Sequence, residues 1–363
     1  MKRKIAFYIS SLAKGGAQRV ILNLTENFLQ KGHDVLIVTT AVVENEYELP
    51  KGAMRIISDI QGEEITSNRM KNLKNRLTKL RNIWKSQKPD VIVSFIGKNN
   101  FMAILTAWRT KIPVLVSVRG EPTAEYYSKG LRLLAKYLFQ KADGIILQTE
   151  DSKSFFPKRT VKRAVVLSNP LNPEFTNYLY QGKKEKKIVM VGRIDSNKNQ
   201  KLAIDAFVPL VSKYSEYKME IWGDGEDYEA IKAYVSSLKL ENRILLPGAT
   251  HNVREKIEKA SIYILSSDTE GMPNALMEAM ALGLPCISTD CPCGGPKTLI
   301  QDGINGLLTP VGDIEAMTKA IDRVLGNPGF AAELGRNALK IRETLSPENV
   351  NNQWESYLLS KIK

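Results

Sequence analysis

The sequence comprises 363 residues, of which 43% are hydrophobic, 25% charged and 7% aromatic. These proportions are ordinary for a soluble globular chain, and they exclude a disordered chain, a collagen or a disulfide-stabilised mini-protein. A chain of this length normally forms two domains. Its three cysteines, Cys286, Cys291 and Cys293, fall within eight positions. They are too few and too close together for an extracellular disulfide framework.

The sequence shows no signal for export or membrane insertion. Its basic start, residues 1–4, is followed by only five largely apolar residues, 5–9, so we expect no signal peptide. No stretch reaches the ~18 uninterrupted apolar residues that a spanning helix needs. We therefore predict a cytoplasmic protein that is peripherally associated with the inner face of the cell membrane.

The net charge of +13 is distributed unevenly along the chain. Residues 1–175 carry 29 Lys and Arg against 15 Asp and Glu, whereas residues 176–363 carry 23 against 24. Such asymmetry indicates an anionic partner for the first half, either a nucleic acid or an acidic membrane surface. The simpler alternative is a basic surface that only keeps the protein soluble.

Strand and helix patterns alternate through both halves. A β-rich run at 4–10 precedes a helical pattern at 17–32, which ends on Gly32. Further apolar runs predict strands at 34–40, 90–95, 113–118, 143–149 and 164–169, and in the second half at 186–192, 217–223, 242–248, 261–267 and 285–289. Because these runs are continuously apolar, both faces of each sheet should be covered by helices, as in parallel α/β sheets.

This pattern predicts an α/β protein with two doubly wound, Rossmann-like domains that face each other across a cleft. The first domain should span 1–171, a polar linker 172–186 and the second domain 187–343. Residues 344–363 should form a C-terminal helix that packs back on the first domain. Ligands are expected at the carboxyl ends of the strands.

The segment 268–290 contains a candidate binding site. Glu270 lies in the loop after a strand, and Glu278 lies about one and a half turns inside the following helix, which Pro273 opens and Gly283 closes. The exposed amides at the start of that helix would bind an anion such as phosphate; these residues are Gly271, Met272, Pro273, Asn274 and Ala275. Taken singly, Glu270 could be an ordinary loop acid and Glu278 a helical surface residue.

The segment 191–207 follows the first strand of the second domain. Arg193 stands just past that strand, and Lys198 stands at the entry of the next helix. A guanidinium fork and a point charge on one turn suit a diphosphate group. The alternative is a solvated turn whose basic residues have no special role.

Together, GRIDSNKNQ (192–200), the block at 222–248 and EGMPNALMEAMALGLPCIST (270–289) resemble the donor domain of family-four (group 1) glycosyltransferases. These are retaining enzymes with the GT-B fold. The opening ISSLAKGGAQRVILNLTENFLQKGHDVLIVTT is similar to that family's first strand, glycine loop and helix, with Gly15 and Gly16 in the loop. The resemblance covers essentially the whole chain, and its most specific part is the Glu270–Glu278 spacing.

The resemblance implies roles for these residues. Glu278 would hold the ribose hydroxyls, and Glu270 would lie beside the transferred sugar. Arg193 and Lys198 would neutralise the diphosphate as charge builds on it in the transition state. The backbone near Gly248 and Thr250 would contact the base. The donor would be a nucleotide diphosphate sugar, with a UDP-sugar favoured.

No cofactor or metal is expected. Relatives of this family need no metal, and His33 and His251 are the only histidines and lie far apart in sequence. The spacing Cys291-Pro292-Cys293 is not that of a zinc ligand pair. We interpret these cysteines as ordinary buried or loop residues.

The first domain departs from the family pattern after the strand at 113–118. Many relatives place a histidine there, whereas this chain has Arg119, with Glu121 nearby. Arginine cannot act as a base, since it does not lose its proton in proteins. Retention in this family is thought to use the leaving phosphate oxygen as the base, so activity is not excluded. Arg119 and Glu121 are assigned to the acceptor side, where Arg119 would bind an anionic part of donor or acceptor.

The excess of positive charge is concentrated in residues 68–88. This segment contains no acid and has an apolar stripe that includes Trp84, which is typical of a helix on a membrane surface. The cations assigned to lipid phosphates are Arg69, Lys71, Lys74, Arg76, Lys79 and Arg81. Residues 129–141 could extend the same face. Alternatively, the stripe packs on the sheet and the cations are solvated.

The leading hypothesis is therefore a retaining, metal-independent glycosyltransferase that acts on a membrane-associated acceptor. A polyprenyl-diphosphate-linked glycan of a bacterial surface polysaccharide, such as a capsule, would fit the basic first half. A nucleotide-sugar epimerase or hydrolase on the same fold is an alternative. A nicotinamide-dependent oxidoreductase is less favoured because GGAQRV is not G-x-G-x-x-G. A nucleic-acid-binding protein lacks a recognition motif here, so no nucleic-acid partner is expected.

Overall fold

The protein is an α/β protein with two parallel sheets. A computed structural model describes residues 1–362, which contain one sheet of seven strands and one of six. The chain divides into two compact units, the first formed by Met1–Pro170 with the final segment from Glu348, and the second by Leu171–Pro347. The segment 172–186, which the sequence indicated as a linker, falls within the second unit. The predicted cleft between the domains stays a prediction.

The first unit is a doubly wound Rossmann-like domain. Its strands lie in the order β3-β2-β1-β4-β5-β6-β7, all paired in parallel. The strands are β1 (Lys4–Ile9), β2 (Asp34–Thr39), β3 (Met54–Ile57), β4 (Val91–Phe95), β5 (Val114–Ser117), β6 (Gly144–Leu147) and β7 (Ala164–Val166). The helices are α1 (Gly16–Gln30), α2 (Arg69–Gln87), α3 (Lys98–Ala107), α4 (Pro122–Glu125), α5 (Lys129–Leu138), α6 (Lys158–Val161) and α15 (Pro347–Leu359).

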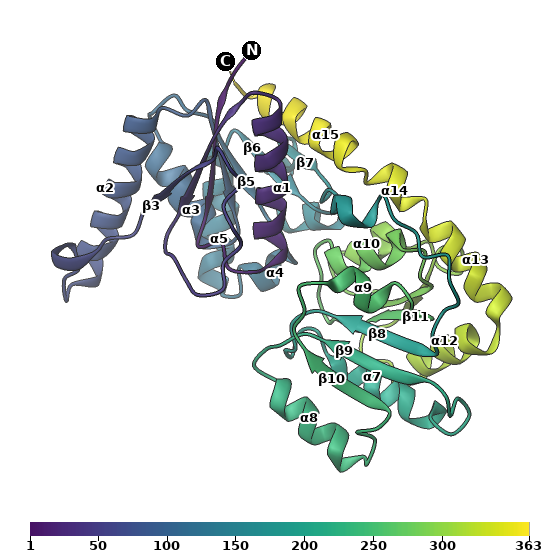
Figure 1. Cartoon of the computed structure of the whole chain (residues 1–363). Helices are drawn as coiled ribbons and strands as arrows, with labels where there is room; N and C mark the ends of the chain where they lie inside the picture. Colours follow the sequence, from purple (N-terminus) through teal and green to yellow (C-terminus); the bar gives the residue numbers. More distant parts are fainter. Residues whose placement is uncertain (363) are drawn as a thin grey trace. The chain divides into compact units, whose positions relative to one another are not determined.

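Helices cover both faces of this first sheet, as the unbroken apolar strands predicted (Figure 1). Successive side chains of β1 point to opposite faces. Phe7 stacks on Phe28 of α1, whereas its neighbour Tyr8 meets Trp84 of α2 edge to face. Helices α2, α3 and α5 share one core with this second face.

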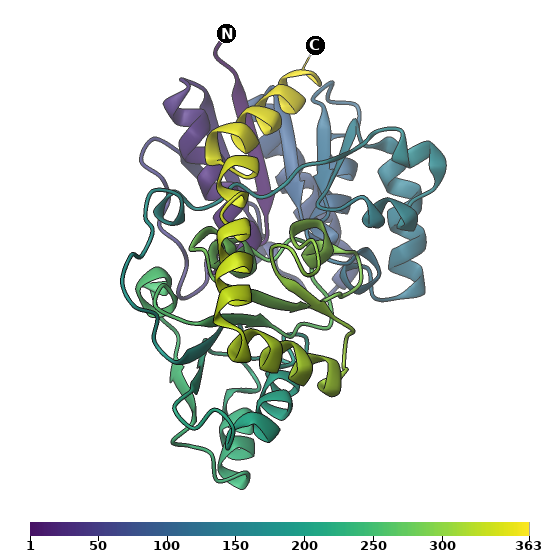
Figure 2. The same cartoon turned by 90° about the vertical axis from the view of Figure 1, so that its right-hand side faces the viewer.

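The last helix, α15, belongs to the first unit. Trp354 is fully buried, stacks on Phe95 and donates its Nε1 proton to the carbonyl oxygen of Ser168 at 3.0 Å. Glu355 lies 3.0 Å from the Nε2 atom of His33. Figure 2 shows α15 running along the face of the first sheet. The helix begins at Pro347, three residues after the boundary expected from the sequence, because the short helix α14 (Ile341–Thr344) precedes it.

The second unit repeats the architecture with the strand order β10-β9-β8-β11-β12-β13. Its strands are β8 (Lys187–Val191), β9 (Lys218–Trp222), β10 (Ile244–Gly248), β11 (Ile262–Leu265), β12 (Cys286–Thr289) and β13 (Leu307–Thr309). Its other helices are α7 (Gln200–Phe207), α8 (Tyr228–Ser237), α9 (Val253–Ile257), α10 (Asn274–Ala281), α11 (Gly295–Leu299), α12 (Ile314–Gly326) and α13 (Pro328–Ala338). Apolar residues of these strands form one core with α7 and α12.

The strand order fixes where each unit can bind a ligand. In both sheets the chain winds outward in one direction and then in the other, so β1 neighbours β4 and β8 neighbours β11. In open α/β sheets, ligands bind outside the carboxyl ends of the strands at such a switch point. The loops after β1, β4, β8 and β11 are therefore the segments where a ligand is expected to bind.

Candidate active site

Two loops of the second unit meet at its switch point. The loop after β11 is tied to the loop after β8 by backbone and side-chain hydrogen bonds. The amide of Asp268 donates to the carbonyl oxygen of Asn197 at 2.8 Å, and the side chains of Thr269 and Asn197 bond at 2.6 Å. The Nδ2 atom of Asn197 also donates to the carbonyl oxygen of Thr269 at 3.1 Å. The two loops therefore behave as one platform.

The two loops bring Lys198 and Glu270 into an ion pair. The Nζ atom of Lys198 contacts Oε1 of Glu270, and the hydroxyl of Ser267 donates to the same oxygen at 2.7 Å. The two side chains keep only 20% and 12% of their accessible surface. A pair this far removed from water needs both partners, because removing one leaves a poorly solvated charge. The structure thus joins two residues that the sequence placed 72 positions apart.

Arg193 lies next to this pair in sequence but is held differently. Its guanidinium contacts Oδ2 of Asp195 at 2.9 Å, while its side chain is 74% exposed. The side chain of Gln200 donates to the carbonyl oxygen of Arg193 at 2.7 Å and fixes the backbone of the turn. The backbone is therefore held while the cation itself can turn toward an incoming anion.

Helix α10 follows the Glu270 loop. It begins at Asn274 with Pro273 as the N-cap, and Gly283 adopts a φ of 68° just beyond its end. Glu278 is only 3% exposed, so its alternative interpretation as a helical surface residue is wrong. Gly271, Met272 and Ala275 lie beside the same helix start, and Met272 is buried.

Glu270 and Glu278 act on a common neighbour, Tyr263 of β11. Burial raises the pKa of the Tyr263 hydroxyl well above its ordinary value, and the nearby carboxylates of Glu270 and Glu278 raise it further. This hydroxyl lies 3.4 Å from the carbonyl oxygen of Val191, at the end of β8. Both carboxylates therefore lie close enough to Tyr263 for their charges to act on it, and their contacts with a donor stay a prediction.

Sequence reasoning missed the support beneath the Glu270 loop. The thiol of Cys293 donates to the carbonyl oxygen of Glu270 at 3.3 Å. A Cβ atom on Gly295 would lie 1.7 Å from the carbonyl oxygen of Gly271, so only glycine fits there. The run Cys293-Gly294-Gly295 was a signal of close backbone approach, but only the fold identifies the loop that it touches.

The proposed base-side residues lie at the end of β10. Gly248 has a φ of 90°, and its carbonyl oxygen accepts from the amide of Gly223 at 3.0 Å. The hydroxyl of Thr250 accepts from the amide of Asn252 at 3.1 Å. Their strand lies two places from β8 in the sheet, so they flank the same carboxyl edge as Lys198.

In the first unit, Gly15 is the N-cap of α1 and Gly16 its first residue, directly after β1. Arg119 follows β5 and is held inside the unit. Its guanidinium donates to Oδ1 of Asn169 and lies 5.5 and 5.6 Å from the ring centres of Phe95 and Trp354. Burial lowers the pKa of Arg119 to about 9, so it remains a cation at neutral pH. These contacts tie it to the core and to α15, and its acceptor role stays a prediction.

Glu121 is the N-cap of the short helix α4, and Glu125 is its last residue. Glu121 caps it by accepting from the amide of Ala124 at 2.6 Å. Glu125, which the sequence did not single out, accepts from the amides of Gly97 at 2.7 Å and Arg119 at 3.1 Å. Burial raises the pKa of this carboxyl group. Glu125 therefore joins the loops after β4 and β5, and its sequence neighbourhood gave no sign of that.

The basic helix predicted at 68–88 is α2, and only part of its apolar stripe is buried. Trp84 and Leu80 lie in the core, whereas Met70 is 73% exposed. Among the assigned cations, Arg76 pairs with Asp59, Lys79 pairs with Glu64, and Arg81 donates to the carbonyl oxygen of Trp108. Within the described residues, Arg69, Lys71 and Lys74 are the assigned cations whose side chains form neither an ion pair nor a hydrogen bond.

Residues 1–362 show neither a membrane-spanning helix nor a metal-binding cluster. None of their helices is both long and apolar enough to cross a membrane. They also contain no group of three or more His, Cys, Asp or Glu side chains placed to hold a metal ion. Metal independence stays a prediction.

The fold is that of a two-domain α/β protein, and comparison with known proteins identifies its class. One family model, Glycosyltransferase Family 4, matches residues 14–175, and another, Glycosyl transferases group 1, matches residues 177–341. Together the two regions cover nearly the whole chain. The chain therefore belongs to the GT-B glycosyltransferases of family 4, group 1.

Similar proteins include enzymes of glycan assembly. The chain is 29% identical over 99% of both chains to a protein of Campylobacter jejuni described as GalNAc-α-(1→4)-GalNAc-α-(1→3)-diNAcBac-PP-undecaprenol α-1,4-N-acetyl-D-galactosaminyltransferase. It is 37% identical, over 37% of this chain and 38% of the relative, to the lipopolysaccharide 1,6-galactosyltransferase of Salmonella typhimurium. Anabaena HepE, solved with UDP and glucose, matches with a TM-score of 0.84 at 17% identity over 99% and 100% of the two chains. That likeness shows the fold.

We predict that Gly295→Ala moves the Glu270 loop. The added Cβ cannot fit beside the carbonyl oxygen of Gly271, so Glu270 should shift, and misplacement of about 1 Å can lower turnover about 10²-fold. Gly130→Ala is the control, because no atom lies within 4 Å of its Cβ position. Turnover should be measured for both variants; normal turnover of Gly295→Ala would contradict the close packing.

Proposed function

We propose that this protein transfers a sugar, with retention of anomeric configuration, from a UDP-sugar to a polyprenyl-diphosphate-linked glycan at the inner face of the cell membrane. The observation that carries the proposal is the Lys198–Glu270 ion pair beside Arg193 and the start of α10. Cations, a carboxylate and helix amides at one switch point suit a sugar diphosphate better than any other common donor.

Donor binding would rearrange the charges at this site. The diphosphate competes with Glu270 for Lys198 and with Asp195 for Arg193, and both cations then face the leaving group. Charge builds on the phosphate oxygens as the glycosidic bond breaks, so cations already in place lower the barrier. Glu270, released from Lys198, accepts hydrogen bonds from the sugar hydroxyls and faces the positive charge on the sugar ring.

The remaining donor contacts follow from the same edge of the sheet. Glu278 accepts from the two ribose hydroxyls, since an ionised carboxylate has two acceptor oxygens. The amides of Gly271 to Ala275, apart from that of Pro273, are directed at the phosphates. Gly248 and Thr250 receive the uracil ring through backbone contacts. The UDP complexes of the Anabaena protein support this choice of base.

Retention is proposed from the family resemblance, and the groups assigned to the acceptor side are compatible with it. Arg119 stays protonated, and Glu121 is engaged in capping α4. We infer that the departing phosphate oxygen takes the proton of the acceptor hydroxyl, on the face from which the donor bond breaks. The protein's cations take the place of a divalent metal at the diphosphate.

The acceptor is proposed from the relatives. Two Campylobacter jejuni proteins that match over most of this chain are described as acting on undecaprenol-linked acceptors. A lipid-linked acceptor requires the enzyme to work at a membrane surface. The exposed, unpaired cations of α2, Lys71 and Lys74, with Arg69, supply attraction to anionic lipid phosphates.

A panel of labelled nucleotide sugars with an undecaprenyl-diphosphate-linked oligosaccharide tests the reaction directly. We expect transfer from one UDP-sugar, an α-linked product from an α-linked donor, and undiminished activity in the presence of a metal chelator. An inverted linkage would contradict retention. Loss of activity that magnesium or manganese restores would contradict the donor site described above. Release of free sugar or an epimerised donor without transfer would favour the hydrolase or epimerase alternative.

We predict that Arg193→Ala or Lys198→Ala lowers kcat by roughly 10²–10³, because each removes a charge partner of the transition state. Lys201→Ala is the matched control, since Lys201 lies on α7, is half exposed and pairs with Asp205. An exposed pair of this kind contributes little, so kcat should stay within about twofold of wild type. Steady-state kinetics with the identified donor give the result. If all three variants retain wild-type turnover, neither cation acts on the diphosphate.

We predict that Lys71→Gln/Lys74→Gln weakens binding to anionic vesicles by about 30-fold, from about 1 kcal/mol per cation near a charged surface. The control Lys232→Gln/Lys239→Gln removes the same charge from exposed positions of the second unit. Co-sedimentation at low and high salt measures the effect, which should shrink as salt is added. Equal binding by both variants would show that the α2 cations are only solvated.

A further inference from the structure

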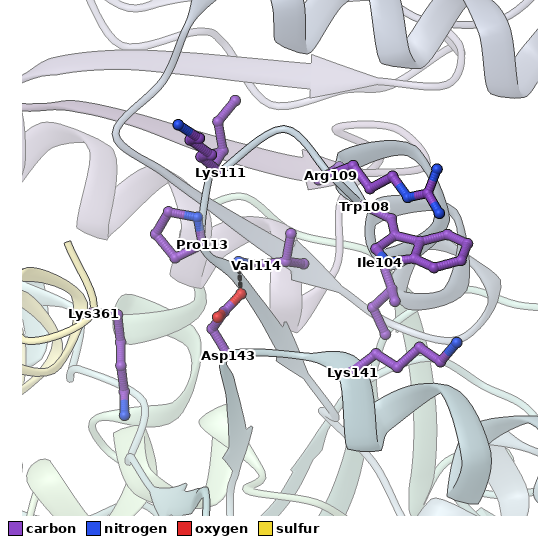
Figure 3. Close-up of a pocket in the computed structure, with 11 residues that line it drawn as sticks. Ile104, Trp108, Arg109, Lys111, Pro113, Val114, Lys141, Asp143 and Lys361 are labelled. Atoms are coloured by element: carbon purple, nitrogen blue, oxygen red, sulfur yellow. Dashed lines mark hydrogen bonds between the residues drawn. The ribbon is translucent and has the colours of Figure 1, made fainter. Parts of the chain in front are cut away.

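A pocket of about 270 Å³ opens at the amino-terminal edge of the first sheet. It lies between the turn that joins α3 to β5, the start of β6 and the end of α15, with a floor of Pro113 and Val114 (Figure 3). The proposed ligand-binding residues Gly15 and Arg119 stand at the opposite, carboxyl edge of this sheet, after β1 and β5. The pocket therefore has no part in the donor or acceptor chemistry proposed above.

Four cations surround this pocket: Arg109, Lys111, Lys141 and Lys361. Within residues 1–362, none of the four side chains forms a hydrogen bond or an ion pair with a carboxylate. Asp143 is the one acid in the lining, and its carboxylate accepts from the amide of Val114 at 2.9 Å. Unpaired cations around a concave surface focus positive potential, so the pocket should attract an anion.

The indole ring of Trp108 fixes two of these cations at the pocket. The guanidinium carbon of Arg109 lies 5.0 Å and the Nζ atom of Lys141 lies 4.7 Å from the ring centre. Figure 3 shows the ring between the two side chains. Cations held over an indole are ordered without being neutralised. They therefore keep their hydrogen-bond donors for a ligand.

The turn that carries Trp108 has an unusual backbone. Arg109 and Lys111 adopt positive φ angles of 68° and 64°, a region that residues other than glycine rarely occupy. Arg81 donates to the carbonyl oxygen of Trp108 at 2.9 Å, and the hydroxyl of Thr110 donates to that of Ala107 at 2.6 Å. Backbone held in this way is characteristic of functional positions. Here it places two cations at the pocket mouth.

The surface beside the pocket indicates the source of the anion. Lys141 lies 5.1 Å from the ring centre of Tyr137, which joins α5 to the Trp108 cluster. Tyr137 is 60% exposed, and Leu133, one turn earlier on α5, is 70% exposed. Helices α2, α3 and α5 contain no acidic residue. Exposed Trp, Tyr and Leu among unopposed cations match the interface of a bilayer that contains anionic lipids.

We propose that this pocket binds the phosphate of an anionic phospholipid headgroup, with Trp108 and Tyr137 in the interfacial layer of the bilayer. The proposal deepens the membrane contact of the proposed function and rests on it. It locates that contact at the turn after α3 and the end of α5, in addition to the charged surface of α2. A lipid bound here leaves the carboxyl edge of the same sheet accessible.

Vesicle binding by matched charge variants tests the proposal. Arg109→Gln/Lys141→Gln should lower partitioning onto phosphatidylcholine vesicles that contain phosphatidylglycerol by about 30-fold. The control Lys232→Gln/Lys239→Gln loses the same charge, and Lys239 shares the positive φ of Arg109, at 58°; it should bind like wild type. Equal binding by the pocket variant and wild type, or an equal loss in the control, would overturn the proposal.

A position-specific readout comes from the indole itself. Of the four tryptophans, Trp84 and Trp354 are fully buried, Trp222 of β9 in the second unit is partly buried, and Trp108 is 53% exposed. Brominated lipid in the same vesicles should quench tryptophan emission in wild type, and Trp108→Phe should abolish most of that quenching. Quenching that persists in Trp108→Phe would place the lipid contact elsewhere. This measurement remains decisive even if the double variant folds poorly.

Soluble phosphate separates the two sources of the anion. Glycerol phosphate should displace the wild-type protein from vesicles more strongly than sodium chloride of the same ionic strength. The variant Arg109→Gln/Lys141→Gln should be displaced equally by the two salts. Binding of glycerol phosphate with no binding to vesicles would overturn the lipid assignment.

Sugar transfer to a short water-soluble acceptor should be unchanged in the pocket variant. If the wild-type protein binds vesicles through the pocket but transfers no sugar, the proposed function is wrong and the proposal of a lipid-binding pocket is still supported. Normal transfer without pocket-dependent binding overturns the pocket alone.

Discussion

The donor-side architecture depends on the ion pair between Lys198 and Glu270. Each partner comes from a different loop, and both are largely removed from water. Such a pair contributes little net stability, because desolvation offsets most of the attraction between the charges. Separating the two side chains would leave each with a poorly solvated, unpaired charge, which costs free energy. The pair therefore holds the two loops together unless another anion pairs with Lys198. The same contact thus orders both loops, and in the proposed function a diphosphate takes the place of Glu270 at Lys198.

The backbone beneath this pair allows the loops to approach closely. A Cβ atom on Gly223 would lie 1.8 Å from the carbonyl oxygen of Gly192, and one on Gly295 would lie 1.7 Å from that of Gly271. Both contacts bring the segment after one strand against the segment after another. Parallel strands end at the same edge, so the residues that follow them must share limited space. Glycines at these positions are therefore part of the site, although they carry no side chain to react.

The sequence predicted the parts that follow from local patterns. Continuous apolar runs gave eleven of the thirteen strands in residues 1–362. The two missed strands, β3 and β13, are outer strands whose sequences, MRII and LLT, contain a charged or polar residue and give no long apolar run. Motif resemblance found Glu270 and Lys198. Glu125, Cys293 and the partial burial of α2 could not be predicted, because each depends on which distant segment packs alongside. Trp108 was missed for the same reason, since a lone aromatic in a turn carries no signal.

The cations of the two units differ in how they are held, and the difference bears on what each can bind. Arg193 and Lys198 are each paired with a carboxylate. An anion must replace that carboxylate, so only a ligand with several well-placed charges, such as a diphosphate, is bound strongly. Arg109 and Lys141 rest on an aromatic ring and have no carboxylate partner within the described residues. They can accept any surface phosphate without exchange, which gives weak, reversible attachment. If the proposed function and the proposed lipid pocket both hold, selective binding of the donor and unselective binding of lipid phosphate follow from where the carboxylates are placed.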